Sequence, residues 1–290
     1  MIDFGKGDVV RVFPRKTKAT PDDAMAVVGQ PTRKFLSSID FDHVDVSVTF
    51  TWDIPKAEAI AEKIACWGFP VDVGGAAYGD RMSTEFVPGK YLRHGLTITS
   101  RGCPKQCWFC SVWKCAQGRV IELPVQDGWN ILDDNILATS KDHFDNAIGM
   151  LKRQKQAPVF SGGLEAEFLT QYHADRLREV KPKSLYLAYD TLDDYDRIVE
   201  ARKKFRNAGF SDKSHVLGCY VLIGYPEDSF EAAEKRLIQT VQAGYMPFAM
   251  LYRGEDGFTQ ESWRPFQREW ASRYIVGSKC NEYGLGSAIF

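Results

Sequence analysis

Apolar and polar positions along the chain predict strands and helices in alternation from residue 96 onward. Six segments have the short apolar runs of strands, and the fifth is nearly unbroken, as expected for a parallel strand covered on both faces. These segments are Leu96–Ser100, Asn130–Leu137, Ala157–Gly162, Ser184–Tyr189, Val216–Gly224 and Pro247–Tyr252. Six strand–helix units in a row predict an α/β fold built as a parallel barrel or as part of one.

Helices are predicted between these strands, because apolar residues recur there every three or four positions. One of them begins near Asp228 or Ser229, either of which can cap it. The apolar residues that recur at this spacing on three helices are Phe144, Ala147, Ile148 and Leu151, then Ile198, Ala201, Phe205 and Ala208, then Phe230, Ala233, Leu237 and Val241. Near the end of the chain, aromatic residues recur every four positions at Phe266, Trp270 and Tyr274. They predict a helical tail over 256–290 that packs on the barrel or covers a substrate as a lid.

The first 90 residues have a pattern of their own. Apolar and polar residues alternate over 46–50, which predicts a half-buried strand. Asp53 then caps a predicted helix that has Pro55 in its first turn, and a second strand follows over 71–73. The apolar face of the helix comprises Ala57, Ile60, Ala61 and Ile64. We therefore expect a small Rossmann-like βαβ lobe over 1–90, the barrel over 91–255 and then the tail.

Composition and charge narrow the classes of partner. The 290-residue chain has 37 Lys and Arg against 38 Asp and Glu, a formal net charge of −1. A nearly neutral chain has no general electrostatic attraction to nucleic acid or to anionic membranes, so neither is an expected partner. No apolar run is long enough to cross a bilayer, and the first residues lack the basic and apolar segments of a signal peptide. The sequence therefore predicts a cytoplasmic protein.

The placement of the cysteines indicates a metal centre. Directly after the first predicted barrel strand, three of the seven cysteines fall within eight positions, at Cys103, Cys107 and Cys110. In a reducing compartment this spacing indicates metal binding and not a disulfide framework. Three thiolates can hold three corners of an iron–sulfur cluster and leave the fourth iron open to an exogenous molecule. The alternative is a structural zinc site with Cys115 as fourth ligand, although such sites usually take their ligands from two separated segments.

The run Cys103-x-x-x-Cys107-x-Phe109-Cys110 resembles the signature of the radical S-adenosylmethionine (SAM) superfamily, including the aromatic residue before the third cysteine. The resemblance implies a partial (β/α)6 TIM-like barrel, a [4Fe–4S] cluster on the three cysteines and SAM bound to the open iron, with Phe109 beside it. It also implies reductive cleavage of SAM to methionine and a 5′-deoxyadenosyl radical, which abstracts hydrogen from a substrate. An electron donor such as flavodoxin or ferredoxin is then an expected partner.

The resemblance also implies cofactor contacts at the ends of other strands. Asp133, Asp134 and Asn135 resemble the acidic strand end that holds the SAM amino group, since a carboxylate suits an ammonium partner. A capping or turn role for these three residues is the equal alternative. Further expected contacts are Asp190, Ile223, Gly224 and Arg253.

A glycine pair and a glutamate follow the third predicted strand. Gly162, Gly163 and Glu165 resemble the glycine–glycine–glutamate motif of the superfamily, which usually lies on the second strand. Glu165 is then a candidate for contact with ribose or substrate, and the two glycines would let the backbone approach a ligand closely. Glycines at a strand end also simply form turns.

The sequence of the N-terminal lobe bears on whether the protein binds cobalamin. Its end at Val73–Ala76 resembles the last part of a cobalamin-binding domain, which places the chain nearest to the cobalamin-dependent and methylthiotransferase-like branch. The usual cobalamin motif Asp-x-His-x-x-Gly is absent, because His43 has no glycine in the required place, so we expect a reduced remnant. The sequence therefore predicts a radical SAM enzyme for a small-molecule or nucleotide-like substrate. The alternatives are a cobalamin-dependent radical SAM methyltransferase and a non-catalytic metal-binding module.

Overall fold

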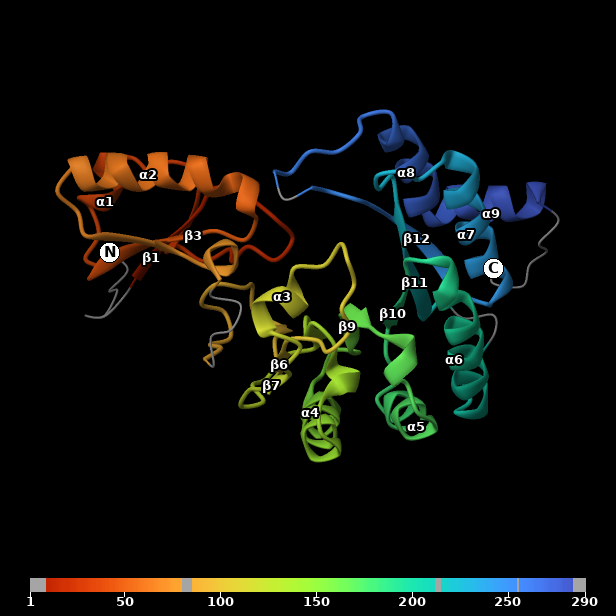
Figure 1. Cartoon of the computed structure of the whole chain (residues 1–290). Helices are drawn as coiled ribbons and strands as arrows, with labels where there is room; N and C mark the ends of the chain where they lie inside the picture. Colours follow the sequence, from red (N-terminus) through yellow and green to blue (C-terminus); the bar gives the residue numbers. More distant parts are fainter. Residues whose placement is uncertain (1–8, 80–84, 212–214, 255, 284–290) are drawn as a thin grey trace. The chain divides into compact units, whose positions relative to one another are not determined.

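The computed structural model describes residues 9–79, 85–211, 215–254 and 256–283 (Figure 1). It is a mixed α/β structure with parallel sheets, and it divides into two compact units. The first unit contains the chain up to Leu96 together with residues 256–257. The second contains 97–254 and the chain from Phe258 on. The first unit therefore extends a few residues past the boundary predicted at residue 90. The predicted tail over 256–290 begins with two residues of the first unit and belongs to the second unit from Phe258 on.

The first unit has a four-stranded parallel sheet with the strand order β2-β1-β3-β4. Its strands are β1 (Val9–Phe13), β2 (Ala26–Val28), β3 (His43–Ser47) and β4 (Val71–Gly74). The short helix α1 (Arg33–Leu36) precedes β3, and α2 (Ile54–Cys66) connects β3 to β4. The βαβ unit predicted from the sequence corresponds to β3, α2 and β4, and the structure adds β1 and β2 beyond β3.

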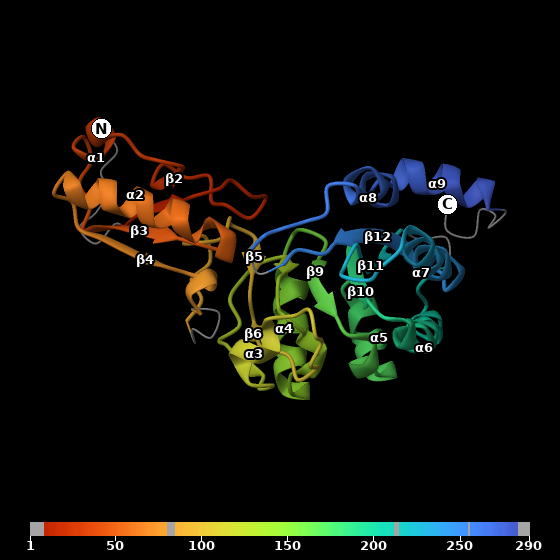
Figure 2. The ribbon, with the colours of Figure 1, turned by 45° about the horizontal axis from the view of Figure 1, so that its top comes forward.

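Helix α2 packs on one face of this sheet, as Figure 2 shows for the orange segment. The helix residues in this core are the four predicted ones, Ala57, Ile60, Ala61 and Ile64. They pack with the fully buried strand residues Val10, Val12, Val44 and Val46. Each large apolar side chain buried in this way stabilises the fold by about 1.5–3 kcal/mol relative to an exposed position.

The second unit has a six-stranded sheet with the order β12-β11-β10-β9-β8-β5. The strands are β5 (Leu96–Thr97), β8 (Asn130–Ile131), β9 (Val159–Leu164), β10 (Ser184–Tyr189), β11 (Leu217–Ile223) and β12 (Met246–Leu251). All pairs from β8 to β12 are parallel. The strands β6 (Ser100–Arg101) and β7 (Ile121–Glu122) form an antiparallel ribbon, and the short helix α3 (Val112–Ala116) lies between them in the chain.

Four helices cover one face of this sheet (Figures 1 and 2). They are α4 (Lys141–Arg153), α5 (Gln171–Glu179), α6 (Tyr195–Asn207) and α7 (Phe230–Gln242). Alternate strand residues such as Leu187 and Val221 are completely buried beneath them. The cap predicted for α7 at Asp228 or Ser229 is Ser229, whose hydroxyl accepts from the Ala232 N–H. No described helix is both long enough and apolar enough to cross a membrane.

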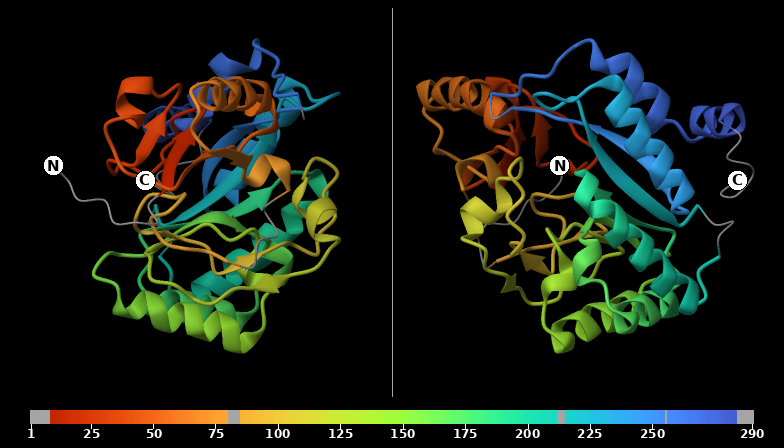
Figure 3. Two further views of the ribbon diagram at one scale, coloured as in Figure 1. Left: turned by 90° about the vertical axis from the view of Figure 1, so that its left-hand side faces the viewer. Right: turned by 45° about the vertical axis from the view of Figure 1, so that its right-hand side comes forward.

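Several predicted elements differ in extent from the structure. The strand expected over Leu96–Ser100 ends at Thr97, and Ser100 lies in β6. The strand expected over Asn130–Leu137 ends at Ile131, because the residues that follow it anchor the segment after β6. The C-terminal tail consists of two helices, α8 (Trp263–Ala271) and α9 (Arg273–Glu282), which Figure 3 shows in blue. Trp270 is completely buried, but Tyr274 is 93% exposed, because the extended backbone of Ser272 interrupts the helical register.

Candidate metal centre

Three cysteines lie on the segment 102–111 between β6 and α3, here called the cysteine loop. The side chains of Cys103, Cys107 and Cys110 are half-buried, whereas Cys66 and Cys115 are exposed. Burial raises the pKa of Cys103, and it raises the pKa of Cys107 to about 12. Without metal these two thiols are therefore protonated at neutral pH, and a bound metal or cluster must displace their protons.

The backbone of Gly102 fixes the start of the cysteine loop. Gly102 has a φ of +88°, and an added Cβ would lie 2.1 Å from the carbonyl oxygen of Arg119. Its N–H donates to Oδ2 of Asp134 at 2.7 Å. Any larger residue at this position would displace the chain beside Cys103.

The residues that follow β8 anchor the same loop. The buried carboxylate of Asp133 accepts hydrogen bonds from the N–H and the hydroxyl of Thr99, both at 2.6 Å, and from the hydroxyl of Ser100 at 2.7 Å. Burial raises the pKa of Asp133 in spite of these bonds. Nδ2 of Asn135 donates to Sγ of Cys103 at 3.6 Å. The structure thus gives Asp133 and Asn135 anchoring contacts, and a contact of either with SAM stays a prediction.

Lys105 ties the cysteine loop to the ends of β9 and β10. Its Nζ lies 2.8 Å from Oε2 of Glu165 and 3.1 Å from Oδ1 of Asp194. The exposed fractions of the Lys105, Glu165 and Asp194 side chains are 19%, 11% and 7%, so water screens these ion pairs little. Burial alone would lower the pKa of Lys105, but the two carboxylates raise it above its usual value. The sequence pattern does not indicate Lys105 and Asp194, because their pairing joins positions far apart in the chain.

Asp190 adds a third carboxyl group at the end of β10. Burial, together with the negative charges of Asp194 and Glu165, raises the pKa of Asp190 to about 7 against the opposing effect of Lys105. Two cations face these three carboxyl groups, because Nη1 of Arg197 also lies 3.4 Å from Oδ1 of Asp194. This part of the second unit gains negative charge when Asp190 ionises, which suits a cationic ligand group such as an ammonium.

The two glycines of the predicted pair, Gly162 and Gly163, have different surroundings. An added Cβ at Gly162 would lie 2.1 Å from the carbonyl oxygen of Asp133, so Gly162 makes room for the neighbouring backbone. An added Cβ at Gly163 would meet nothing within 4 Å. Gly163 is therefore the position where a ligand could approach the backbone of β9.

The other predicted contacts are spread over the ends of β11 and β12. Ile223 is completely buried in the core that the helices cover. The Gly224 N–H donates to Oδ2 of Asp228 at 2.8 Å, and an added Cβ there would lie 2.8 Å from Leu251. Arg253 is exposed at the end of β12. Of these, Arg253 is the side chain that solvent reaches most easily.

Aromatic side chains border the cysteine loop. Trp108 is 50% exposed, and its ring centroid lies 5.5 Å from that of Phe109. The corresponding distances are 5.6 Å to Tyr225, after β11, and 5.7 Å to Tyr252, after β12. Phe109 was a predicted site residue and Trp108 was not, although Trp108 links the cysteine loop to both strand ends.

The spacing of potential ligands bears on the choice between zinc and a cluster. Among the described residues, the possible ligand atoms of His43, Asp45 and Asp72 in the first unit all lie within 4.8 Å of one another. Thiolates bound to one zinc ion at about 2.3 Å lie roughly 4 Å apart. The three Sγ atoms of the cysteine loop do not form such a group, and a cluster does not require one, because there each thiolate binds a different iron.

Comparison with known proteins gives no family for this chain. No protein-family model matches it, and no curated protein matches it either.

Proposed function

We propose that this protein is a radical SAM enzyme that binds a [4Fe–4S] cluster through Cys103, Cys107 and Cys110. The observation that carries the proposal is the cysteine loop, which places three half-buried thiols on one short segment between β6 and α3. The parallel sheet of the second unit would then be the partial barrel of that family. A cluster held by these three cysteines would supply one low-potential electron for the reductive cleavage of the C5′–S bond of SAM, and the products would be methionine and a 5′-deoxyadenosyl radical able to take hydrogen from a substrate.

The surrounding residues have roles that follow from their contacts. Lys105 holds the cysteine loop against Glu165 and Asp194. Asn135 donates to the sulfur of Cys103, and hydrogen bonds to cluster sulfurs tune the reduction potential. The carboxyl group of Asp190 suits the ammonium group of SAM, and Gly163 leaves space for the cofactor beside β9.

Iron binding tests the first part of this proposal. After anaerobic reconstitution with iron and sulfide, the protein should contain about four irons per chain and absorb visible light as a brown cluster protein. Cys107→Ala should lose most of this iron, because one of the three ligands is gone. Cys115→Ala is the matched control, since Cys115 is an exposed cysteine outside the motif, and it should keep the full iron content.

Turnover tests the second part. With SAM and a low-potential reductant, the reconstituted protein should release 5′-deoxyadenosine, measured by chromatography, and Cys107→Ala should release none. Tight zinc binding without iron uptake would contradict the cluster. If the cluster forms but the protein never cleaves SAM, the protein is a non-catalytic metal-binding module and not a radical SAM enzyme.

A further inference from the structure

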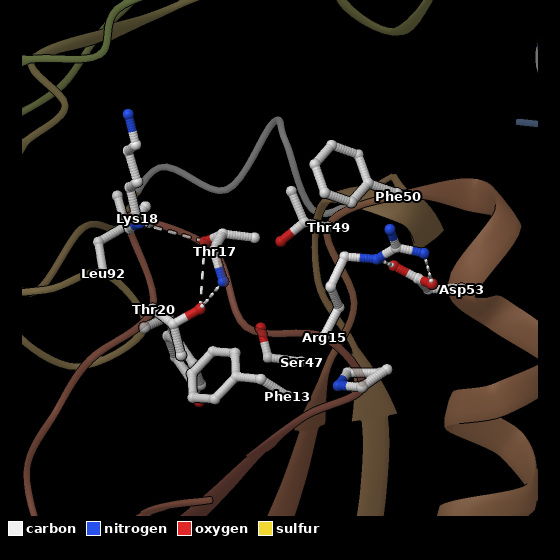
Figure 4. A pocket seen from close by; sticks show the side chains of 13 residues that line it. Phe13, Arg15, Thr17, Lys18, Thr20, Ser47, Thr49, Phe50, Asp53 and Leu92 are labelled. Atoms are coloured by element: carbon white, nitrogen blue, oxygen red, sulfur yellow. Dashed lines mark hydrogen bonds and ion pairs between the residues drawn. The ribbon is translucent and has the colours of Figure 1, made fainter. Parts of the chain in front are cut away.

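The first unit contains a pocket of about 290 Å³ that is separate from the cysteine loop (Figure 4). Its walls come from the segment after β1, from the segment after β3, and from Tyr91 and Leu92. Small-molecule sites usually measure roughly 300–1,000 Å³, so this volume suits a compact ligand and not a corrinoid.

The topology of the sheet explains why a pocket forms here. From β1 the chain moves to the edge strand β2, and it then returns past β1 to β3. The strand order therefore reverses between β1 and β3, whose carboxyl ends carry the pocket. In open parallel sheets this position is where ligands generally bind.

Hydroxyl groups converge on the pocket. Figure 4 shows the side-chain oxygens of Thr17, Ser47 and Thr49 directed toward the same space. Thr17 is held by hydrogen bonds to Thr20 and to the backbone of the same turn. The hydroxyls of Ser47 and Thr49 have no hydrogen-bond partner among the described residues, so they are available as donors to a ligand.

The charge of the pocket is positive. Arg15 and Asp53 neutralise each other through two hydrogen bonds of 2.8 Å. Lys18 also lines the pocket and has no ion-pair partner within the described part of the chain. Because Asp53 immediately precedes α2, the first turn of that helix lies beside the pocket and adds to the positive potential. Donor hydroxyls with a lysine suit a phosphate group.

An aromatic wall stands beside these polar groups. The ring of Phe50 lines the pocket and stacks on Trp52, with centroids 4.7 Å apart and planes at 8°. Gly257 packs on the Trp52 side chain, because an added Cβ would lie 2.6 Å from it. Phe50 is thus held in place before any ligand arrives, and it offers a flat surface to a ring.

We propose that this pocket binds a small phosphate monoester that carries a flat ring, of the nucleoside monophosphate class. The phosphate lies among the hydroxyls of Ser47 and Thr49 with Lys18, and the ring lies against Phe50. The site belongs to the first unit and does not depend on the metal centre, so it can be tested whether or not a cluster forms.

Calorimetric titration of the full chain tests the proposal with the four nucleoside monophosphates, ribose 5-phosphate, adenosine and inorganic phosphate. At least one nucleoside monophosphate should bind with a stoichiometry of one, about tenfold or more tighter than any of the three fragments. Lys18→Gln should weaken that binding about tenfold, because a charge-assisted contact is lost. Phe50→Ala should weaken it as well, while the affinity for ribose 5-phosphate stays unchanged.

Lys16→Gln is the matched control, because Lys16 is an exposed lysine of the same segment that does not line the pocket. It should bind like the unaltered protein. The proposal is overturned if no nucleoside monophosphate binds, if Lys18→Gln and Lys16→Gln bind equally, or if cobalamin binds and is lost on Lys18→Gln. Circular dichroism of each variant shows that its fold is intact, and Thr49→Val replaces any variant that fails this check.

Discussion

At the scale of single residues, the glycines at the end of β9 have opposite surroundings. Gly162→Ala places a methyl group 2.1 Å from a backbone oxygen and should lower the free energy of unfolding by about 1–3 kcal/mol through overpacking. Gly163→Ala meets nothing within 4 Å and should change it by less than about 0.5 kcal/mol. Urea unfolding of both variants measures the difference. Equal losses would mean that β8 does not approach Gly162 as described.

The candidate site shows which residues a sequence can identify. The three thiols of the cysteine loop are local in sequence, so their spacing alone indicated a metal centre. Lys105 could not be identified in this way, because its partner Asp194 lies 89 positions away and the two meet only after β10 has joined the sheet. The carboxylate of Asp133 was identified as a candidate, but its partners Thr99 and Ser100 depend on the fold.

At the scale of elements, α4 and α5 are joined by one carboxylate. Asp145 on α4 accepts hydrogen bonds from Tyr172 and Arg176 on α5 and from Lys141 on its own helix. These contacts, with that of Tyr172 first, hold the pKa of Asp145 well below its usual range. A carboxyl group with a lowered pKa in the folded protein adds stability above its unfolded pKa, near 3.9, and that stability is lost as the pH falls further.

Asp145→Asn should therefore lower the free energy of unfolding at pH 7 by about 1 kcal/mol, as for a partly exposed charge network. The difference in the free energy of unfolding between this variant and the unaltered protein should shrink when the pH is lowered from 5 to 2. Thermal unfolding across this range measures both effects. Asp142→Asn, an exposed position of the same helix, should show neither, and a difference that does not depend on pH would contradict the assignment.

The sequence predicted well those strands and helices in which buried apolar residues repeat at the regular spacing of a strand or a helix. Strand β10 has the predicted bounds Ser184–Tyr189, and α2 buries its predicted face. Strand β1 was missed because Arg11 interrupts its short apolar run. That arginine is accommodated by Asp23 and by the carbonyl oxygens of Gly89 and Lys90, which no local pattern reveals. Strand β8 was predicted too long, because anchoring the cysteine loop competes with pairing in the sheet.

At the scale of the whole molecule, the two units have separate hydrophobic cores. Ile64 is completely buried in the first core, and Ile148 is completely buried in the second. Ile64→Ala and Ile148→Ala each leave a cavity and should each cost about 2–5 kcal/mol in their own core. Hydrogen exchange should therefore speed up mainly in β1 and β3 for the first variant, and mainly in β10 and β11 for the second. Uniform acceleration in both units would show that the cores unfold as one.

The return of the chain to the first unit at residues 256–257 has a consequence during synthesis. Translation proceeds from the N-terminus, so early segments can begin to fold while later ones are still being made. Gly257, which packs on Trp52 behind the aromatic wall of the pocket, leaves the ribosome only after β12 has been made. The first unit therefore begins to be made before the second unit, but its contact between Gly257 and Trp52 forms only after most of the polypeptide has emerged.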